Sequence, residues 1–197
     1  MITRAADGAD FYAKSEDQTC FSGLNILGIR KIPLEERVRF LFEEEHIFES
    51  REICRKVMGR TICVNQQMGD IIYFAPVKKA LTKPDVVLVI CNPKQAMDIL
   101  YASIYTSDVY KAETPFGFAA ACSGAVAQPI ETGEVSFSLS DHGARKCMGM
   151  KTCELLVGIP GGKFLKIVRN LEALQSALKY KYIYFRNKPV PEKSESA

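Results

Sequence analysis

The residues best able to do chemistry are concentrated between Phe116 and Pro160. This stretch holds three of the chain's seven cysteines, one of its two histidines, and Arg145. Thiolates bind metals and attack electrophiles, and imidazole serves as a base near neutral pH. A guanidinium group holds a carboxylate or phosphate with two parallel hydrogen bonds. We therefore expect a site here and treat the rest of the chain as the scaffold around it.

Two cysteines share a local pattern. Cys20 precedes Phe-Ser-Gly23 and Cys122 precedes Ser-Gly124, each near the start of a short apolar stretch with helical spacing. Backbone amides and the helix dipole at a helix amino end favour the thiolate form of cysteine. A free cysteine is also commonly a small buried apolar residue. The pattern leaves both roles open for Cys20 and Cys122.

A second group of candidate metal ligands follows in one predicted loop. This second group consists of Asp141, His142 and Cys147. Together with Cys20 and Cys122 it makes up the candidate ligand set for a metal or an iron–sulfur cluster. The spacing H-x4-C-x5-C, which ends at Cys153, does not match zinc ribbons or fingers, whose paired ligands are two to four residues apart. The metal signal is therefore weak. The remaining cysteines are expected to pack in the core: Cys54, Cys63 and Cys91.

Arg145 follows a turn at Gly143 and is a candidate for binding an anionic ligand or cofactor. The alternative is a solvated arginine or one paired with Glu154. Neither of the glycine-rich phosphate-binding patterns, GxGxxG or GxxxxGK[ST], occurs in the chain.

Composition limits the class of protein. The chain has 197 residues, 47% of them hydrophobic, and a formal net charge of +3. This length suits one domain with a sizeable core, and the small charge gives no reason to expect a nucleic-acid partner. The amino terminus lacks a secretory h-region, and no apolar run reaches the roughly 18 residues of a membrane span. We expect a cytoplasmic protein with reduced thiols and no membrane contact.

The first half of the chain begins with helical patterns. They cover residues 17–29, the stretch from Pro33, and Ser50–Met58. Short apolar strands follow at 69–76 and 84–92, and a helix starts at Asn92-Pro93. Two ladders on that helix predict one wide apolar face: Ala96, Leu100, Ile104 and Met97, Tyr101, Tyr105.

The second half repeats this order. A small-residue helix ends before Pro129, strands follow at 133–140 and 153–160, and an amphipathic helix covers Gly161–Leu178. We predict a single α+β domain over 1–178. Its mainly antiparallel sheet is built from two related strand–strand–helix halves, at about 15–106 and 113–178, with helices packed on the sheet. A pseudo-twofold axis between the halves would bring Cys20 and Cys122 together.

The final segment, 179–197, alternates basic and aromatic residues before a polar tail. Alternation predicts an edge strand with Tyr180, Tyr182 and Tyr184 on one face. The tail beyond it is expected to be disordered.

Several segments in order carry a family resemblance. They read GADFYAKSEDQTCFSGLNILGI, APVKKALTKPDVVLVICNPKQAMDILYASIY, ACSGAVAQPIETGEVSFSL, GAR and ELLVGIP, from Ala6 to about Leu174. The chain resembles the uncharacterised prokaryotic domain-of-unknown-function family 169, which is common in archaea. The resemblance implies a shared fold and assigns no reaction.

Two departures from the family pattern bear on the site. Members usually carry a preceding segment with an extended strand and another cysteine, so the first sheet is expected to lack a strand here. Many archaeal members read LGCxGCR where this chain has LSDHGAR, so their two cysteines fall on Asp141 and Ala144. The resemblance implies that an iron–sulfur cluster or metal held by those cysteines in relatives lacks these ligands here.

Three hypotheses of function remain, and they leave open whether the protein is an enzyme. The first is a protein that binds a small ligand, metal or redox cofactor through Cys20, Cys122 and the loop Asp141–Arg145. The second is a thiol-dependent enzyme with Cys122 as nucleophile and His142 as base. The third is a non-catalytic subunit or degenerate paralogue, in which a second copy or another protein covers the place of the missing amino-terminal strand.

Overall fold

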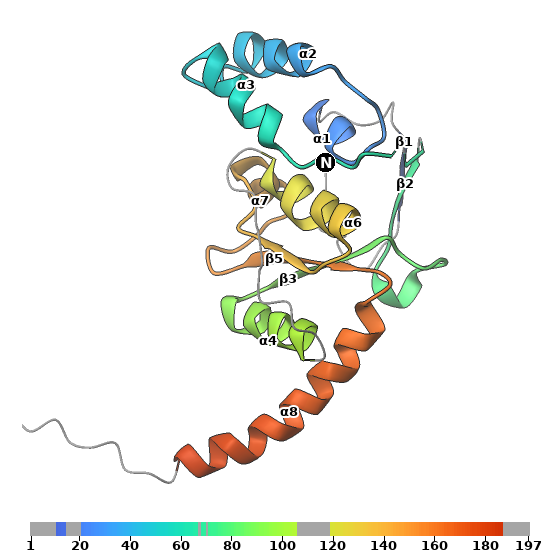
Figure 1. Ribbon diagram of the computed structural model, residues 1–197, viewed down its shortest axis with the longest axis vertical. Helices are drawn as coiled ribbons and strands as arrows, with labels where there is room; N and C mark the ends of the chain where they lie inside the picture. Colours follow the sequence, from blue (N-terminus) through green and yellow to red (C-terminus); the bar gives the residue numbers. More distant parts are fainter. Residues whose placement is uncertain (1–10, 15–20, 67, 70, 106–118, 187–197) are drawn as a thin grey trace, which may run out of the picture.

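The central element of the fold is an antiparallel sheet with the strand order β3-β5-β4. The computed structural model describes residues 11–14, 21–66, 68–69, 71–105 and 119–186. Strand β5 (Leu155–Pro160) lies between β3 (Val86–Cys91) and β4 (Ser136–Ser138). Every residue of β5 is buried, which explains its unbroken apolar sequence. With helices on both faces of this sheet, the predicted α+β class is confirmed (Figure 1).

Helices α4 (Pro93–Ile104) and α8 (Phe164–Arg186) cover one face of the sheet (Figure 1). Helix α4 begins with a capping box, in which Asn92 and Gln95 exchange side-chain and backbone hydrogen bonds. The Asn170 amide donates to the carbonyl of Ala102 at 2.8 Å and so joins the two helices.

The opposite face of the sheet is covered by one continuous helical stretch. It consists of α5 (Ala120–Cys122), the π-helical segment η5 (Ser123–Ala127) and α6 (Gln128–Thr132). Glycine at position 158 of β5 allows the close approach, because a Cβ there would lie 2.0 Å from the carbonyl oxygen of Ala125. Helix and sheet therefore meet backbone to backbone.

The prediction that this helix ends before Pro129 is wrong. Proline has no N–H and leaves a helix carbonyl without a donor. The Ser136 hydroxyl of β4 donates to the carbonyl of Gly124, five residues before the proline, and Ser138 donates to Ala120 at 2.9 Å. The Ser136 hydroxyl supplies a donor near the position where Pro129 has none, and the Ser138 hydroxyl adds a second donor to the carbonyl of Ala120, so the helix continues to Thr132.

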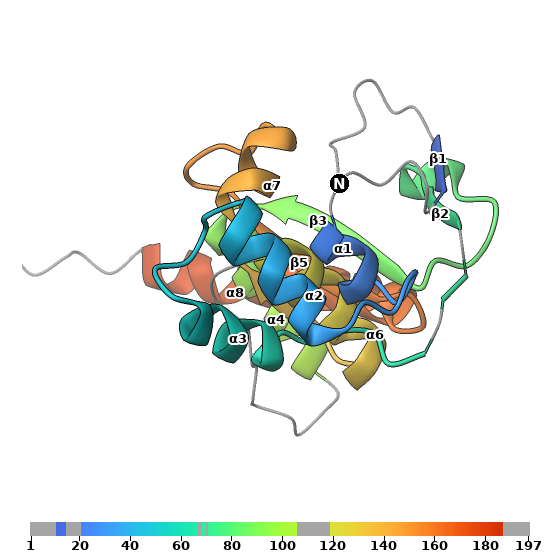
Figure 2. The ribbon, with the colours of Figure 1, turned by 90° about the horizontal axis from the view of Figure 1, so that it is seen from above.

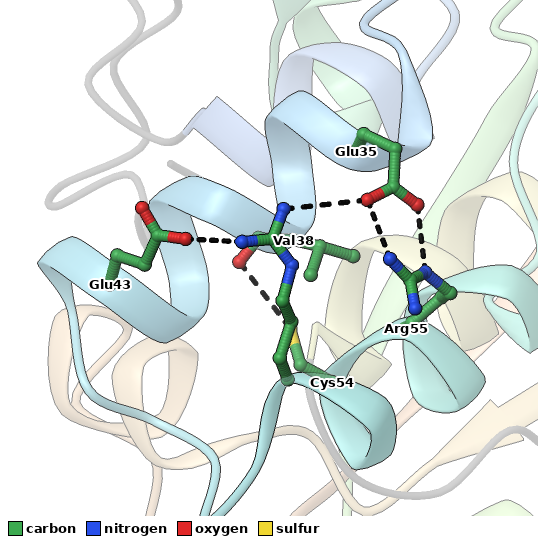
Figure 3. Close-up of polar contacts among 6 residues, drawn as sticks. Glu35, Val38, Glu43, Cys54 and Arg55 are labelled. Carbon is green, nitrogen blue, oxygen red and sulfur yellow. Dashed lines mark hydrogen bonds and ion pairs between the residues drawn. The ribbon is translucent and has the colours of Figure 1, made fainter.

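A further helical layer lies beyond the α5–η5–α6 stretch (Figures 1 and 2). It contains α1 (Phe21–Ile26), α2 (Leu34–Arg39) with the π-helical segment η3 (Phe40–Glu44), and α3 (Arg51–Arg60). Glu35 accepts two hydrogen bonds from Arg55, and Arg51 pairs with Glu43, so ion pairs join α2–η3 to α3 on the surface (Figure 3). These exposed pairs contribute little stability individually.

The predicted strand at 69–76 is present as β2 (Ile71–Phe74), but it pairs with β1 (Phe11–Lys14) in a separate two-stranded sheet. A short 3-10 turn, η4 (Val77–Lys79), follows it. In the described residues, the first half of the chain therefore gives the main sheet one strand and the second half gives it two. Strands β3 and β5 pair antiparallel along their full length, from Val86 opposite Pro160 to Cys91 opposite Leu155, and the duplication of the two halves stays a prediction.

Three local predictions differ from the structure. Helix α8 continues to Arg186, so the predicted edge strand with Tyr180, Tyr182 and Tyr184 is wrong; the tail at 187–197 lies outside the described residues. The single apolar face of α4 is also wrong, because Met97, Tyr101 and Tyr105 are 43%, 57% and 51% exposed. The predicted loop at Asp141–Arg145 is instead the start of helix α7 (His142–Cys147), with Asp141 as its cap.

Within the described part of the chain, a helix both long and apolar enough to cross a membrane is not found.

Candidate functional site

Cys122 lies where three parts of the core meet. It is the last residue of α5, is partly buried, and packs against three separate hydrophobic clusters. The clusters come from the sheet side, from α1 and the loop after it, and from residues around Val64 and Ala127. The thiol therefore faces an apolar interior formed by segments far apart in sequence.

The backbone around Cys122 is unusual. It occupies the junction between the short α5 and the π-helical segment η5. Helical segments of the π type are rare and occur frequently at functional sites. Ala119, just before α5, has a φ of 56°, a left-handed conformation that is uncommon for a residue other than glycine. Two local departures from regular helix thus flank the cysteine.

Asp141 joins the helix that carries Cys122 to helix α7. Its Oδ1 accepts a hydrogen bond from the amide of Ala144 at 2.8 Å, which caps α7, and its Oδ2 accepts from the amide of Ala121 at 3.3 Å. The carboxylate thus lies at the amino end of α5, one residue before the cysteine. A negative charge there opposes the effect of the helix dipole, so the amino end of α5 is poorly suited to stabilise a Cys122 thiolate.

Arg145 holds a turn of the chain together. Its guanidinium donates to the backbone carbonyls of Leu139 at 2.9 Å, Glu154 at 3.0 Å and Lys151. The Glu154 carboxylate in turn accepts from the Lys151 amide at 2.8 Å. These contacts fix the connection between α7 and β5. They give Arg145 a structural role that the sequence does not reveal, because backbone acceptors leave no pattern in the side chains.

The other predicted ligands are spread apart or fall outside the description. His142 is exposed in the first turn of α7, and Cys153 is exposed in the turn before β5. Cys20 lies outside the described residues, as does the side chain of Cys147. Among the described side chains, three or more His, Cys, Asp or Glu residues do not gather in a group able to hold a metal ion.

The three cysteines expected in the core differ in their surroundings. Cys54 and Cys91 are buried, and burial raises the pKa of both thiols. The Cys54 thiol donates to the carbonyl of Val38 at 3.8 Å (Figure 3). Cys63 is only partly buried. Burial has the largest effect on the pKa of its thiol and raises it, while Arg37 and Asn25 act to lower it.

Sequence reasoning missed the pair formed by Cys63 and Arg37. Arg37 is 9% exposed although it carries a charge. A signal was present: Arg37 follows Leu34 by three residues and precedes Leu41 by four, so it lies on the apolar face of the helix that begins at Pro33. Charged residues on such a face are rarely fully buried unless they are paired.

Comparison with known proteins places the chain in a family. The model of DUF169, described as Uncharacterised ArCR, matches residues 1–170. The chain is similar to the uncharacterized protein MJ0308 of Methanocaldococcus jannaschii, with 25% identity over 162 residues, which cover 82% of this chain and 69% of the relative. No solved structure matches the chain. The match over residues 1–170 shows that the chain belongs to the uncharacterised family DUF169.

Proposed function

We propose that this protein binds a small ligand between α1 and the α5–η5–α6 helix, with Cys122 in contact with the ligand. The observation that carries the proposal is the contact of one partly buried thiol with three hydrophobic clusters, at the junction of an α-helical and a π-helical segment. Binding sites are typically apolar interiors with a few polar groups that fix orientation. The ligand is therefore expected to be mainly apolar.

The segment 62–65 is hydrogen-bonded to both α1 and the α5–η5–α6 helix. The amide of Val64 donates to Ile26 at 2.8 Å, and the Ser123 hydroxyl donates to Ile62 at 3.0 Å. The Asn65 amide donates to the Glu131 carboxylate at 2.8 Å. These bonds hold the walls of the proposed site in place before a ligand arrives, which lowers the entropic cost of binding.

Native mass spectrometry tests the proposal with two variants. The full chain is purified anaerobically and without denaturation from cells that make it naturally, and its mass is compared with the denatured mass. Cys122→Ala is expected to lose most of the bound mass, because the thiol is part of the contact surface. Elemental analysis of the same samples tests the version in which Cys20 and Cys122 hold a metal.

Cys153→Ala is the matched control, because Cys153 is exposed in the turn before β5. It should retain the bound mass at the wild-type level. Equal loss or equal retention by the two variants would exclude a specific role for Cys122.

The thiol-dependent enzyme, with Cys122 as nucleophile and His142 as base, has weaker support. Asp141 connects the two helices that carry these residues, which brings their amino ends together. The same carboxylate disfavours a thiolate on α5, and a nucleophilic cysteine needs the thiolate form.

A second candidate function is assembly with another copy of the chain. An exposed apolar stripe runs along α4 and its C-cap residue; it consists of Met97, Tyr101 and Tyr105. The stripe itself carries no charge, so two copies can face each other there without like-charge repulsion. Tyr101→Lys is expected to convert a dimer into a monomer in sedimentation equilibrium, by placing like charges opposite each other. A wild-type chain that sediments as a monomer at high concentration would contradict this candidate.

A further inference from the structure

Arg37 places a positively charged guanidinium inside the protein. The residue is 9% exposed, and its Nε and Nη1 atoms are buried without a hydrogen-bond partner among the described residues. A buried guanidinium without an anion is strongly unfavourable, and native structures rarely leave one. An anion beside Arg37 would resolve this imbalance.

The Cys63 thiol is a polar neighbour of Arg37: burial raises the pKa of this thiol, while the charge and hydrogen bonding of Arg37 act to lower it. The thiol is held in place from both sides: it accepts a hydrogen bond from the Asn25 side-chain amide at 3.3 Å and donates to the carbonyl of Thr61 at 3.5 Å. Asn25 is itself fixed, because its Oδ1 accepts from the Ile32 amide at 2.9 Å.

This thiol does not supply the missing negative charge. Its donor bond to Thr61 requires the protonated form, and burial raises the pKa of Cys63. The carboxylate that also acts on Cys63 belongs to Glu131, which already accepts hydrogen bonds from the backbone and side chain of Asn65. The counter-ion of Arg37 is therefore not found among these groups.

We propose that Arg37, beside Cys63, binds the carboxylate group of a small, mainly apolar organic acid. One guanidinium matches one negative charge and forms strong, directional hydrogen bonds to a carboxylate. A phosphate dianion would need a second cation, and Arg37 is the one basic group among those that act on Cys63.

The apolar body of the acid has a matching surface. Cys63 packs against a cluster of Ile26, Val64, Ala119 and Ala127, with Ile62 and Ile130 beside it. Cys122 packs against the same cluster. The inference goes beyond the proposed role of Cys122, because it rests on Arg37 and stands whether or not Cys122 touches the ligand.

Butyrate is a suitable probe, because it combines a carboxylate with a short apolar chain. It is titrated into the full chain at constant ionic strength, and binding is followed by the rise in Tm; inorganic phosphate is titrated in parallel. Wild type is expected to bind butyrate, and Arg37→Met is expected to bind it at least ~30-fold more weakly. Arg37→Met should fold with an unchanged or higher Tm, because an apolar side chain replaces an unpaired buried charge.

Arg39→Met is the matched control, since Arg39 is exposed on the same helix. It should bind butyrate as wild type does. If Arg37→Met does not fold, Arg37→Lys is the test, because lysine keeps the positive charge and lacks the planar guanidinium group. Unchanged butyrate binding by Arg37→Lys overturns the proposal. The proposal is also overturned if butyrate does not raise the Tm of the wild-type chain, or if phosphate raises it equally.

Discussion

Replacing Gly158 with alanine is expected to lower the free energy of unfolding by about 4 kcal/mol or more. The added Cβ would lie 2.0 Å from the carbonyl oxygen of Ala125 and 2.8 Å from Cγ of Pro129. Both neighbours are part of the helix that covers the sheet, so the new methyl group cannot be accommodated by a side-chain rotation. The α5–η5–α6 helix must move away from β5, and the packing around Cys122 moves with it.

Gly59→Ala is the matched control for this substitution. A Cβ at Gly59 has open space around it, and the residue lies within helix α3. Alanine there should stabilise the protein by about 0.5–1 kcal/mol, because glycine loses more backbone entropy in a helix. Urea unfolding of the two variants measures both effects. A Gly158→Ala variant as stable as wild type would mean that the helix does not lie against β5 as described.

Arg145→Met is expected to cost about 3 kcal/mol of folding free energy, the second large effect. The substitution removes the guanidinium that donates to the carbonyls of Leu139, Lys151 and Glu154, while methionine keeps much of the aliphatic packing. Hydrogen exchange of the amides between Met148 and Glu154 should accelerate more than exchange in α4, because the connection between α7 and β5 loses the hydrogen bonds from the guanidinium.

Lys146→Met is the control, because Lys146 is the exposed neighbour on the same helix. It should leave both stability and exchange near wild-type values. If Arg145→Met behaves like Lys146→Met in both measurements, the guanidinium does not hold the turn, and a ligand-binding role for Arg145 becomes the better explanation.

Elements with local signals were predictable from the sequence. The run Val86–Cys91 is β-branched and apolar, which favours a buried strand. Asn92 followed by Pro93 marks a helix start, and Ser50 caps α3 by accepting from the Ile53 amide at 3.2 Å. These signals act within a few residues, so the α+β class follows from them.

Features that depend on distant partners were not predictable. The period of β2 indicates a strand, but nothing in it specifies pairing with β1 instead of the main sheet. Pro129 normally ends a helix, and it is tolerated because Ser136 from another strand supplies a donor to Gly124. Such interactions are set by tertiary packing, which overrides local propensity.

The candidate site shows the same division. Cys122 stood out through its position beside a helix start, whereas its packing against three clusters depends on segments far apart in the sequence. Arg37 was overlooked, because a charged residue in a helix rich in Glu and Arg is ordinarily a surface residue. The spacing from Leu34 and Leu41 places Arg37 on the apolar face of its helix, but the depth of its burial depends on where α2 packs.

The mass of the wild-type chain under native conditions tests the central claim most directly. The protein is purified anaerobically from cells that make it naturally and is measured before and after denaturation. The proposed function predicts a native mass above the denatured mass by one small ligand, and the inference from Arg37 predicts that the released compound carries a carboxylate. A native mass equal to that of the bare chain would contradict ligand binding between α1 and the α5–η5–α6 helix.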